Sequence, residues 1–305
     1  MAHAHEGTAD RSPDRGHRLL IALALNLGIT VAEVVGGVLS GSLALIADAA
    51  HNLSDAGAVL VSYIAWRISR RAANEKRTFG YARAETVGAL INLTALIMIG
   101  LYLLYEAGSR LFEPTEVVAT TVLIVGAIAF VEDVAAAWVL RKDLGSLNVR
   151  STFLHMIADA LATVAVIASG VAIMVWGPAV SWIDPVVTAM IAVYVLIHAS
   201  REIREAIAVL MDSAPKGFHH DELVARLQGT AGVSDVHHLH VWRISEDRTA
   251  LQVHLIVDEP ELSAATALKE RLKRELHDDF DIDHATIEIE AADGIEHDTD
   301  LVRKE

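Results

Sequence analysis

The chain is 305 residues long and too apolar for an ordinary water-soluble domain. Hydrophobic residues make up 53% of it and charged residues 21%, and its mean hydropathy is +0.38, above the usual composition of soluble domains. The net charge of −15 argues against nucleic acid as a partner, because phosphates require a basic surface. The absence of cysteine excludes disulfides and thiolate metal sites.

The charge is unevenly distributed along the chain. Residues 212 to 305 hold 22 acidic and 10 basic side chains and so carry −12 of the net charge, which leaves −3 for the first 211 residues. Two parts in different surroundings are therefore expected. The predicted division is a polar cytoplasmic tail over 1–17, a membrane domain over 18–211, a cytoplasmic domain over 212–291 and an acidic disordered tail over 292–305.

Six apolar runs precede residue 212, and each reaches the ~20 residues that a helix needs to cross the hydrocarbon core. They lie at roughly 19–40, 44–66, 87–110, 117–140, 153–176 and 185–209. The first run is too long for a signal peptide and contains Asn26 and Glu33 without a clean cleavage site. The runs predict an α-helical membrane protein with six transmembrane helices in contact with the lipid bilayer.

The basic residues between the runs predict an orientation. They gather at the amino terminus and after the second and fourth runs, as Arg11, Arg15, Arg18, Arg67, Arg70, Arg71, Lys76, Arg77, Arg83, Arg141, Lys142 and Arg150. The other three turns share one basic residue, Arg110. Because cytoplasmic loops carry the excess of Lys and Arg, both termini are expected in the cytoplasm and the protein in the cytoplasmic membrane.

After Asp212 the pattern changes to that of a small mixed domain. In 249–257, Leu251, Val253 and Leu255 alternate with Gln252 and His254, which is typical of a half-buried strand. The expected elements are a helix at 219–228, strands at 235–245 and 249–257, a helix at 264–278 and a strand at 285–290. The sequence therefore predicts a cytoplasmic αββαβ domain.

Two apolar runs contain the same spaced pair of polar residues. The second carries His51 and Asp55, and the fifth carries His155 and Asp159. Positions i and i+4 lie on one face of a helix, so each run presents an imidazole and a carboxylate toward a common point. Two such helices facing each other predict a tetrahedral two-His two-Asp site, a ligand set that suits zinc.

These pairs admit other interpretations. Polar groups in membrane helices also serve as hydrogen-bonding contacts between helices, and a closed zinc site can simply lock two helices together. Exchange of zinc for protons is favoured over these alternatives. Two carboxylates offset the charge of Zn²⁺, whereas the empty site would keep two buried negative charges without compensation, which is costly. Imidazole takes up a proton near physiological pH, so protons and metal compete for the same ligands.

Three other acids in the runs have open roles. Asp48 precedes His51 by one helical turn and either orients it or lies on the helix surface. Glu132 and Asp133 are adjacent in the fourth run and either line a cation route or bond between helices.

Several motifs together resemble the cation diffusion facilitator family, the proton-coupled zinc exporters. They are Gly41-Ser-Leu-Ala-Leu-Ile-Ala-Asp48-Ala-Ala-His51-Asn-Leu-Ser-Asp55, Thr78-Phe-Gly-Tyr-Ala-Arg-Ala-Glu85, Ser146-Leu-Asn-Val-Arg-Ser-Thr-Phe-Leu-His155-Met-Ile-Ala-Asp159, Asp184-Pro185 and Val236-His-His-Leu-His-Val-Trp242. The resemblance implies a homodimer with a metallochaperone-like, ferredoxin-like cytoplasmic domain. It also implies alternating-access exchange of cytoplasmic Zn²⁺, and of Cd²⁺, Co²⁺ or Fe²⁺ in an unknown rank order, for protons at the site of His51, Asp55, His155 and Asp159.

The resemblance also implies metal in the cytoplasmic domain, at His237 and His254 with His240 and Glu290. In a regular strand His237 and His240 face opposite sides, and a solvated histidine-rich edge is the alternative.

Arg83 and Asp212 match a charge interlock in the family, although an ordinary surface pair fits equally well. The fourth run commonly carries Asn where this chain has Asp133.

Two other classes of function compete with transport. A membrane-embedded metallohydrolase needs an open zinc position and a general base, and no HExxH occurs. A non-transporting metal sensor would bind metal without moving it. The expectation is a transporter rather than an enzyme, with zinc as transported and regulatory ion and no organic cofactor.

Overall fold

The computed structural model describes residues 13–69, 71–141, 147–245, 248–258 and 261–291. These residues form two compact units, which are described separately. The first contains the described residues up to Val61 together with Ile91–Glu202, and the second contains Ser62–Leu90 together with the described residues from Ile203 onward.

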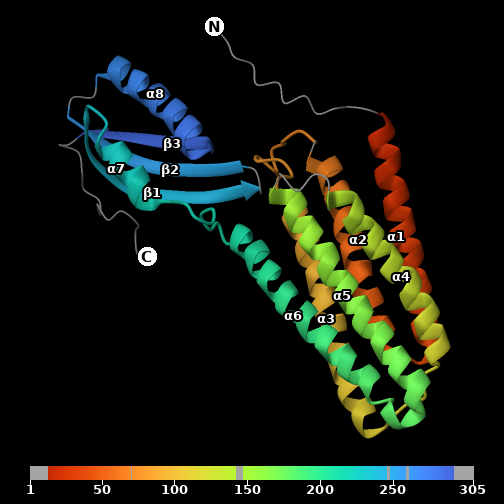
Figure 1. Cartoon of the computed structure of the whole chain (residues 1–305). Helices are drawn as coiled ribbons and strands as arrows, with labels where there is room; N and C mark the ends of the chain where they lie inside the picture. Colours follow the sequence, from red (N-terminus) through yellow and green to blue (C-terminus); the bar gives the residue numbers. More distant parts are fainter. Residues whose placement is uncertain (1–12, 70, 142–146, 246–247, 259–260, 292–305) are drawn as a thin grey trace. The chain divides into compact units, whose positions relative to one another are not determined.

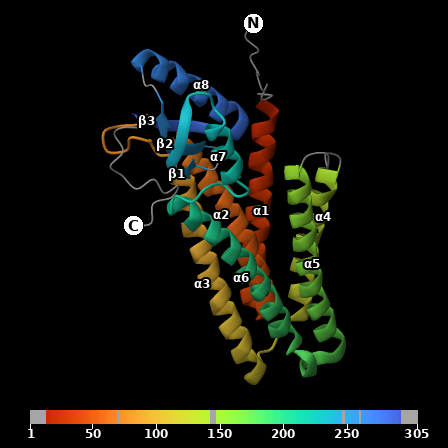
Figure 2. The same cartoon turned by 90° about the vertical axis from the view of Figure 1, so that its left-hand side faces the viewer.

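Each apolar run of the sequence falls within a long helix, except that the fourth run begins two residues before its helix (Figures 1 and 2). The helices are α1 (Pro13–Ser40), α2 (Leu43–Ser69), α3 (Ala84–Phe112), α4 (Ala119–Leu140), α5 (Leu147–Trp176) and α6 (Ile183–Leu210), with a short 3₁₀ helix η2 (Gly177–Val180) before α6. Among the described residues, α3, α4, α5 and α6 are long and apolar enough to cross a membrane. The helical membrane domain is confirmed, and the count of six crossings stays a prediction.

Glycines let α4 and α5 pack closely along their length. A Cβ atom at Gly126 of α4 would lie 3.0 Å from Ile167 Cγ1, and one at Gly170 of α5 would lie 3.1 Å from Val122 Cγ1. Small residues at such positions allow membrane helices to approach each other. Gly126 shares its helix face with Asp133, and Gly170 shares its face with Thr163, because both pairs are seven residues apart. The close approach therefore brings two polar side chains together between these helices.

The start of α2 is fixed by an acid from α6. Asp184 Oδ1 accepts a hydrogen bond from Ser42 Oγ at 2.5 Å, and its Oδ2 accepts one from the backbone N–H of Leu43 at 2.8 Å. The first N–H groups of a helix have no partner within the helix, and a carboxylate there also offsets the positive end of the helix dipole. Asp184 thus positions the helix that carries His51 and Asp55.

The second unit contains the expected αββαβ arrangement. Its elements are α7 (His220–Gln228), β1 (Val233–Ser245), β2 (Arg248–Val257), α8 (Leu262–Phe280) and β3 (Ile282–Ala291). The sheet has the order β1-β2-β3, with β1 antiparallel and β3 parallel to β2. The alternation predicted for β2 is observed: Leu251, Val253 and Leu255 join the buried core that α7 and α8 cover, whereas His254 is only partly buried.

Strand β1 is irregular at its histidines. His237 pairs with His254 of β2 and His240 pairs with Gln252, and the register shifts between these two pairs. Within the shift, His238 has a φ angle of 49°, in the left-handed region that residues other than glycine rarely occupy. This bulge breaks the alternation of side chains between the two faces of the strand.

Candidate metal centre

The structure brings the four side chains predicted for the membrane site together between α2 and α5. His51 Nε2 lies 3.0 Å from Asp159 Oδ1 and 3.8 Å from Asp55 Oδ2. His155 Nε2 lies 3.0 Å from Asp55 Oδ2 and 3.6 Å from Asp159 Oδ2. One ligand atom from each residue lies within 4.8 Å of all the others. We call His51, Asp55, His155 and Asp159 the four-ligand group.

These distances suit a tetrahedral zinc ion. Bonds of about 2.0 Å from zinc to nitrogen or oxygen place tetrahedral ligand atoms about 3.3 Å apart. The observed separations of 3.0 to 3.8 Å bracket that value. The donor set of two imidazoles and two carboxylates suits zinc and cobalt better than manganese, which prefers oxygen ligands.

The four-ligand group is closed on one side and accessible on the other. The side chains of His51 and Asp159 are 9% and 5% exposed, whereas those of Asp55 and His155 are 39% and 32% exposed. Asp55 and His155 are therefore the more exposed half of the four-ligand group, and His51 and Asp159 are its buried half.

Asp48, which the sequence offered as a residue that orients His51, contacts Thr163 instead. Its Oδ2 lies 3.1 Å from Thr163 Oγ1 on α5, and His51 Nδ1 has no hydrogen-bond partner among the described residues. Asp48 therefore does not hold the His51 ring through a hydrogen bond. Thr163 was missed by sequence reasoning, because a threonine in an apolar run carries no recognisable signal.

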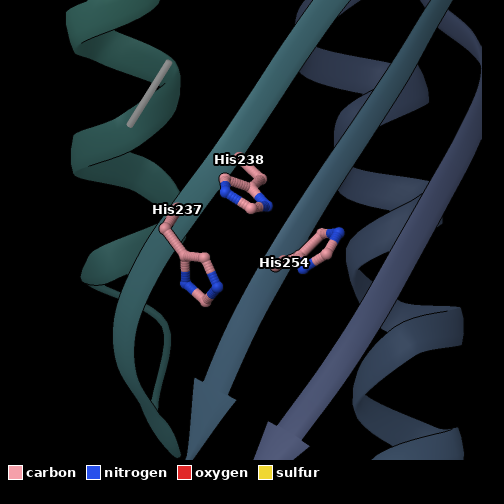
Figure 3. Close-up of side chains that lie close together, drawn as sticks. All are labelled: His237, His238 and His254. Carbon is pink, nitrogen blue, oxygen red and sulfur yellow. The ribbon is translucent and has the colours of Figure 1, made fainter. Parts of the chain in front are cut away.

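A second group of possible ligands lies in the cytoplasmic αββαβ domain. Figure 3 shows His237 and His238 on β1 beside His254 on β2, and their ligand nitrogens lie within 4.8 Å of one another. His237 is fully buried, and neither of its ring nitrogens has a hydrogen-bond partner among the residues that the structure describes. Buried imidazole nitrogens without partners suit a metal ligand. We call these three residues the histidine group.

Carboxylates complete this region, and His240 lies outside it. Glu290 Oε1 lies 2.7 Å from His254 Nδ1 and its Oε2 lies 3.4 Å from His237 Nε2, while Glu288 Oε2 lies 3.3 Å from His254 Nε2. His240 is exposed and belongs to none of the possible metal groups in the described part of the chain. The bulge at His238 explains the difference, because it places His238 rather than His240 beside His237.

Arg83 and Asp212 form an ion pair, as the sequence suggested. Arg83 Nη2 bonds Asp212 Oδ1, and the two side chains are 36% and 60% exposed. Such exposure makes the pair resemble an ordinary surface ion pair, whose contribution to stability is small.

Comparison with protein families gives two matches that together cover most of the chain. The model of the cation efflux transmembrane domain matches residues 19–211, and that of the cation efflux protein cytoplasmic domain matches residues 215–292.

Curated relatives match along nearly their whole length. The cadmium, cobalt and zinc/H⁺-K⁺ antiporter of Bacillus subtilis is 33% identical over 95% of this chain and 92% of its own. The metal cation efflux system protein CzcD of Cupriavidus metallidurans is 35% identical over 95% and 90%, and the zinc transporter ZitB of Escherichia coli is 34% identical over 95% and 93%.

Among solved structures, the metal-bound C-terminal domain of the CzcD transporter is 35% identical over 23% of this chain and 96% of its own, with a TM-score of 0.21. The two family matches and the full-length relatives are sufficient by themselves: the chain belongs to the cation efflux family, also called the cation diffusion facilitators.

Proposed function

We propose that this protein is a secondary active transporter that exports Zn²⁺ from the cytoplasm in exchange for protons. Relatives of matching length are named as zinc transporters and as a cadmium, cobalt and zinc/H⁺-K⁺ antiporter, which supports the same class of cargo here. The observation that carries the proposal is the spacing of the four-ligand group, 3.0 to 3.8 Å between imidazole nitrogens and carboxylate oxygens.

The exchange follows from the charges of the ligands. Two carboxylates balance a dication, and in its absence protons on the imidazoles and carboxylates reduce the net charge of the buried site. Lowering the pH on the outer side protonates the ligands and releases the metal. The accessible side at Asp55 and His155 is the route between the site and water in one state of an alternating-access cycle.

A hydrolase is disfavoured by the same geometry. Catalytic zinc keeps one coordination position for water, whereas the four-ligand group supplies four protein atoms that all lie within 4.8 Å of one another. A metal sensor that does not transport remains the competing proposal, and it differs from a transporter only in flux.

The cytoplasmic domain is proposed to hold a regulatory metal ion. His237, His238 and His254 would bind it together with Glu290, since one ring nitrogen of each histidine lies within 4.8 Å of the other two and Glu290 lies beside His237 and His254. Bound metal would stiffen this domain and bias the transport cycle. The proposal includes a homodimer, six crossings, both termini in the cytoplasm and location in the cytoplasmic membrane.

The test is zinc flux in proteoliposomes with an imposed pH gradient. We expect wild-type protein to take up zinc while dissipating the gradient, and His51→Ala to lose this activity. His198→Ala is the matched control: His198 forms a similar i, i+4 pair with Glu202, at 3.6 Å on α6, but lies outside the four-ligand group.

Two outcomes would contradict the proposal. Equal flux in wild type and His51→Ala would remove the four-ligand group from transport. Zinc binding that depends on His51 without any flux under a pH gradient would favour the sensor.

A further inference from the structure

Four buried polar side chains form a separate group next to the four-ligand group. They are Glu33 on α1, Asp48 on α2, Asp133 on α4 and Thr163 on α5. Their exposed fractions are 0%, 1%, 5% and 1%. We call them the acid–threonine group. Four different helices contribute to it, so it is a built feature of the helix packing rather than a surface patch.

Thr163 is surrounded by more acceptor oxygens than its hydroxyl can serve. Its Oγ1 lies 3.1 Å from Asp48 Oδ2, 3.0 Å from Asp133 Oδ2 and 3.1 Å from the backbone oxygen of Asp159. A threonine hydroxyl donates one hydrogen and accepts through two lone pairs. With both carboxyl groups ionised, two of the three contacts would be oxygen against oxygen with no hydrogen between them.

Added protons satisfy this arrangement completely. Thr163 donates to the Asp159 carbonyl, four residues earlier, as threonine commonly does within helices. Protonated Asp48 and Asp133 then each donate to Thr163 Oγ1. One proton satisfies two of the three contacts and two protons satisfy all three.

Glu33 gives an independent indication of a missing positive charge. Its Oε2 accepts a hydrogen bond from Asn52 Nδ2 at 3.0 Å, but its fully buried Oε1 has no partner among the described residues. The acids that act on it electrostatically are Asp48, Asp133 and Glu132. A third carboxyl group therefore faces the same interior region with one oxygen unpartnered.

The charged surroundings also require compensation. Asp133 interacts electrostatically with Asp48, Asp159 and Glu132. Asp48 interacts with Glu33, Asp133, Asp159 and His51, and of these only His51 can carry a positive charge. In the described part of the chain, no lysine or arginine forms an ion pair with Glu33, Asp48 or Asp133. Buried charges of one sign without a partner are strongly unfavourable.

We propose that the acid–threonine group is a second cation site, which holds a proton on Asp133 and releases it when a divalent cation occupies the four-ligand group. The O–H bond of the carboxylic acid breaks, the proton passes to water and a carboxylate remains. Asp159 links the two groups, because its side chain belongs to the four-ligand group while its backbone oxygen contacts Thr163. A dication beside Asp159 compensates the new negative charge.

The proton site rests on the proposed function only where it is given a role in the exchange of zinc for protons. Its test measures zinc binding and protonation and does not require transport. Infrared difference spectra of the purified full-length protein are recorded on addition of zinc at neutral pH, in H₂O and in D₂O. We expect wild type to lose a carbonyl band of a buried protonated carboxyl group that shifts in D₂O. Asp133→Asn should lack most of this loss and should release about one proton fewer per zinc bound, while still binding zinc.

Glu202→Gln is the control, because Glu202 pairs with His198 on α6 and belongs to neither the four-ligand group nor the acid–threonine group; it should keep the wild-type band. If Asp133→Asn does not fold, Thr163→Val replaces it: it removes the oxygen that accepts from both acids and should shift the band.

Three results would overturn the proposal. In the first, wild-type protein shows no band of a protonated carboxyl group before zinc is added. In the second, zinc leaves this band unchanged. In the third, zinc changes the band of the tested variant just as it changes that of wild type. A carboxylate signal that responds to potassium instead of pH would assign the site to a metal cation rather than a proton. A protein that loses the band on zinc binding but shows no flux would contradict the proposed function and leave the proton site intact.

Discussion

His51 Nε2 on α2 lies 3.0 Å from Asp159 Oδ1 on α5, although the two residues are 108 positions apart in the sequence. This contact joins the two helices at the point where each presents its paired histidine and aspartate. A change at either residue should therefore affect the binding of metal more than the fold of either helix.

Replacement of Asp159 by Asn should weaken zinc binding by ~100-fold or more, because the loss of residues that merely support metal ligands already costs 10- to 100-fold. The amide keeps the size of the side chain but removes one negative charge from the group. Competition with a fluorescent zinc chelator, in purified full-length protein, measures the affinity. Unchanged affinity would show that Asp159 is not a ligand.

Replacement of His51 by Asp should change the preference among metals. The site would then offer one nitrogen and three carboxylates, and oxygen ligands favour manganese relative to zinc. Binding of Zn²⁺ and Mn²⁺ by the variant and by wild type gives the ratio of affinities. A ratio equal to that of wild type would contradict the assignment of His51.

Zinc affinity should fall as the pH is lowered, because protons compete with zinc for the ligands of the four-ligand group. A protonated imidazole cannot bind metal, so each proton that zinc displaces costs on the order of tenfold in affinity per pH unit. Titrations from neutral to mildly acidic pH test this sign. His198→Ala, outside the group, should show the same pH dependence as wild type.

In the cytoplasmic domain, His238→Ala should lower the amount of zinc bound per chain, whereas His240→Ala should not. The reason is that His238 lies within the histidine group and His240 is exposed outside it. Metal content after dialysis is the measurement, in protein that also carries Asp159→Asn so that the membrane site does not contribute. The opposite order of effects would place the metal on the other side of β1.

Asp184→Ala should destabilise the membrane domain by about 1–2 kcal/mol, the usual cost of losing a cap at a helix start. Three oxygen and nitrogen atoms at the start of α2, from Ser42, Leu43 and Ala44, would lose their acceptor. Thermal unfolding in detergent measures the change. Asp184→Asn keeps one acceptor oxygen and should lie between wild type and Asp184→Ala.

The sequence predicted most of the elements and the four-ligand group. Long apolar runs and an alternating strand are local patterns, so the helices and the β2 core followed from them. The i, i+4 spacing also predicted that His51 and Asp55 share one helix face, as do His155 and Asp159.

The bulge in β1 was not predicted, because a left-handed φ at His238 leaves no mark in composition or spacing. The resemblance to the family, and not the strand pattern, suggested His240 as a companion of His237, although a regular strand places these two side chains on opposite faces. The shift in register between β1 and β2 places His238 beside His254 instead.

By itself, the sequence determined which side chains share a helix or strand face, because 3.6 residues per turn and alternation along a strand are properties of the local backbone. Only the tertiary structure decided which faces meet. The contact of Thr163 with Asp48 and Asp133 depends on how α2, α4 and α5 pack. That packing depends on contacts between residues far apart in the chain, such as Gly126 with Ile167 and Asp184 with Leu43, so no local pattern could reveal a buried hydroxyl with too many acceptors.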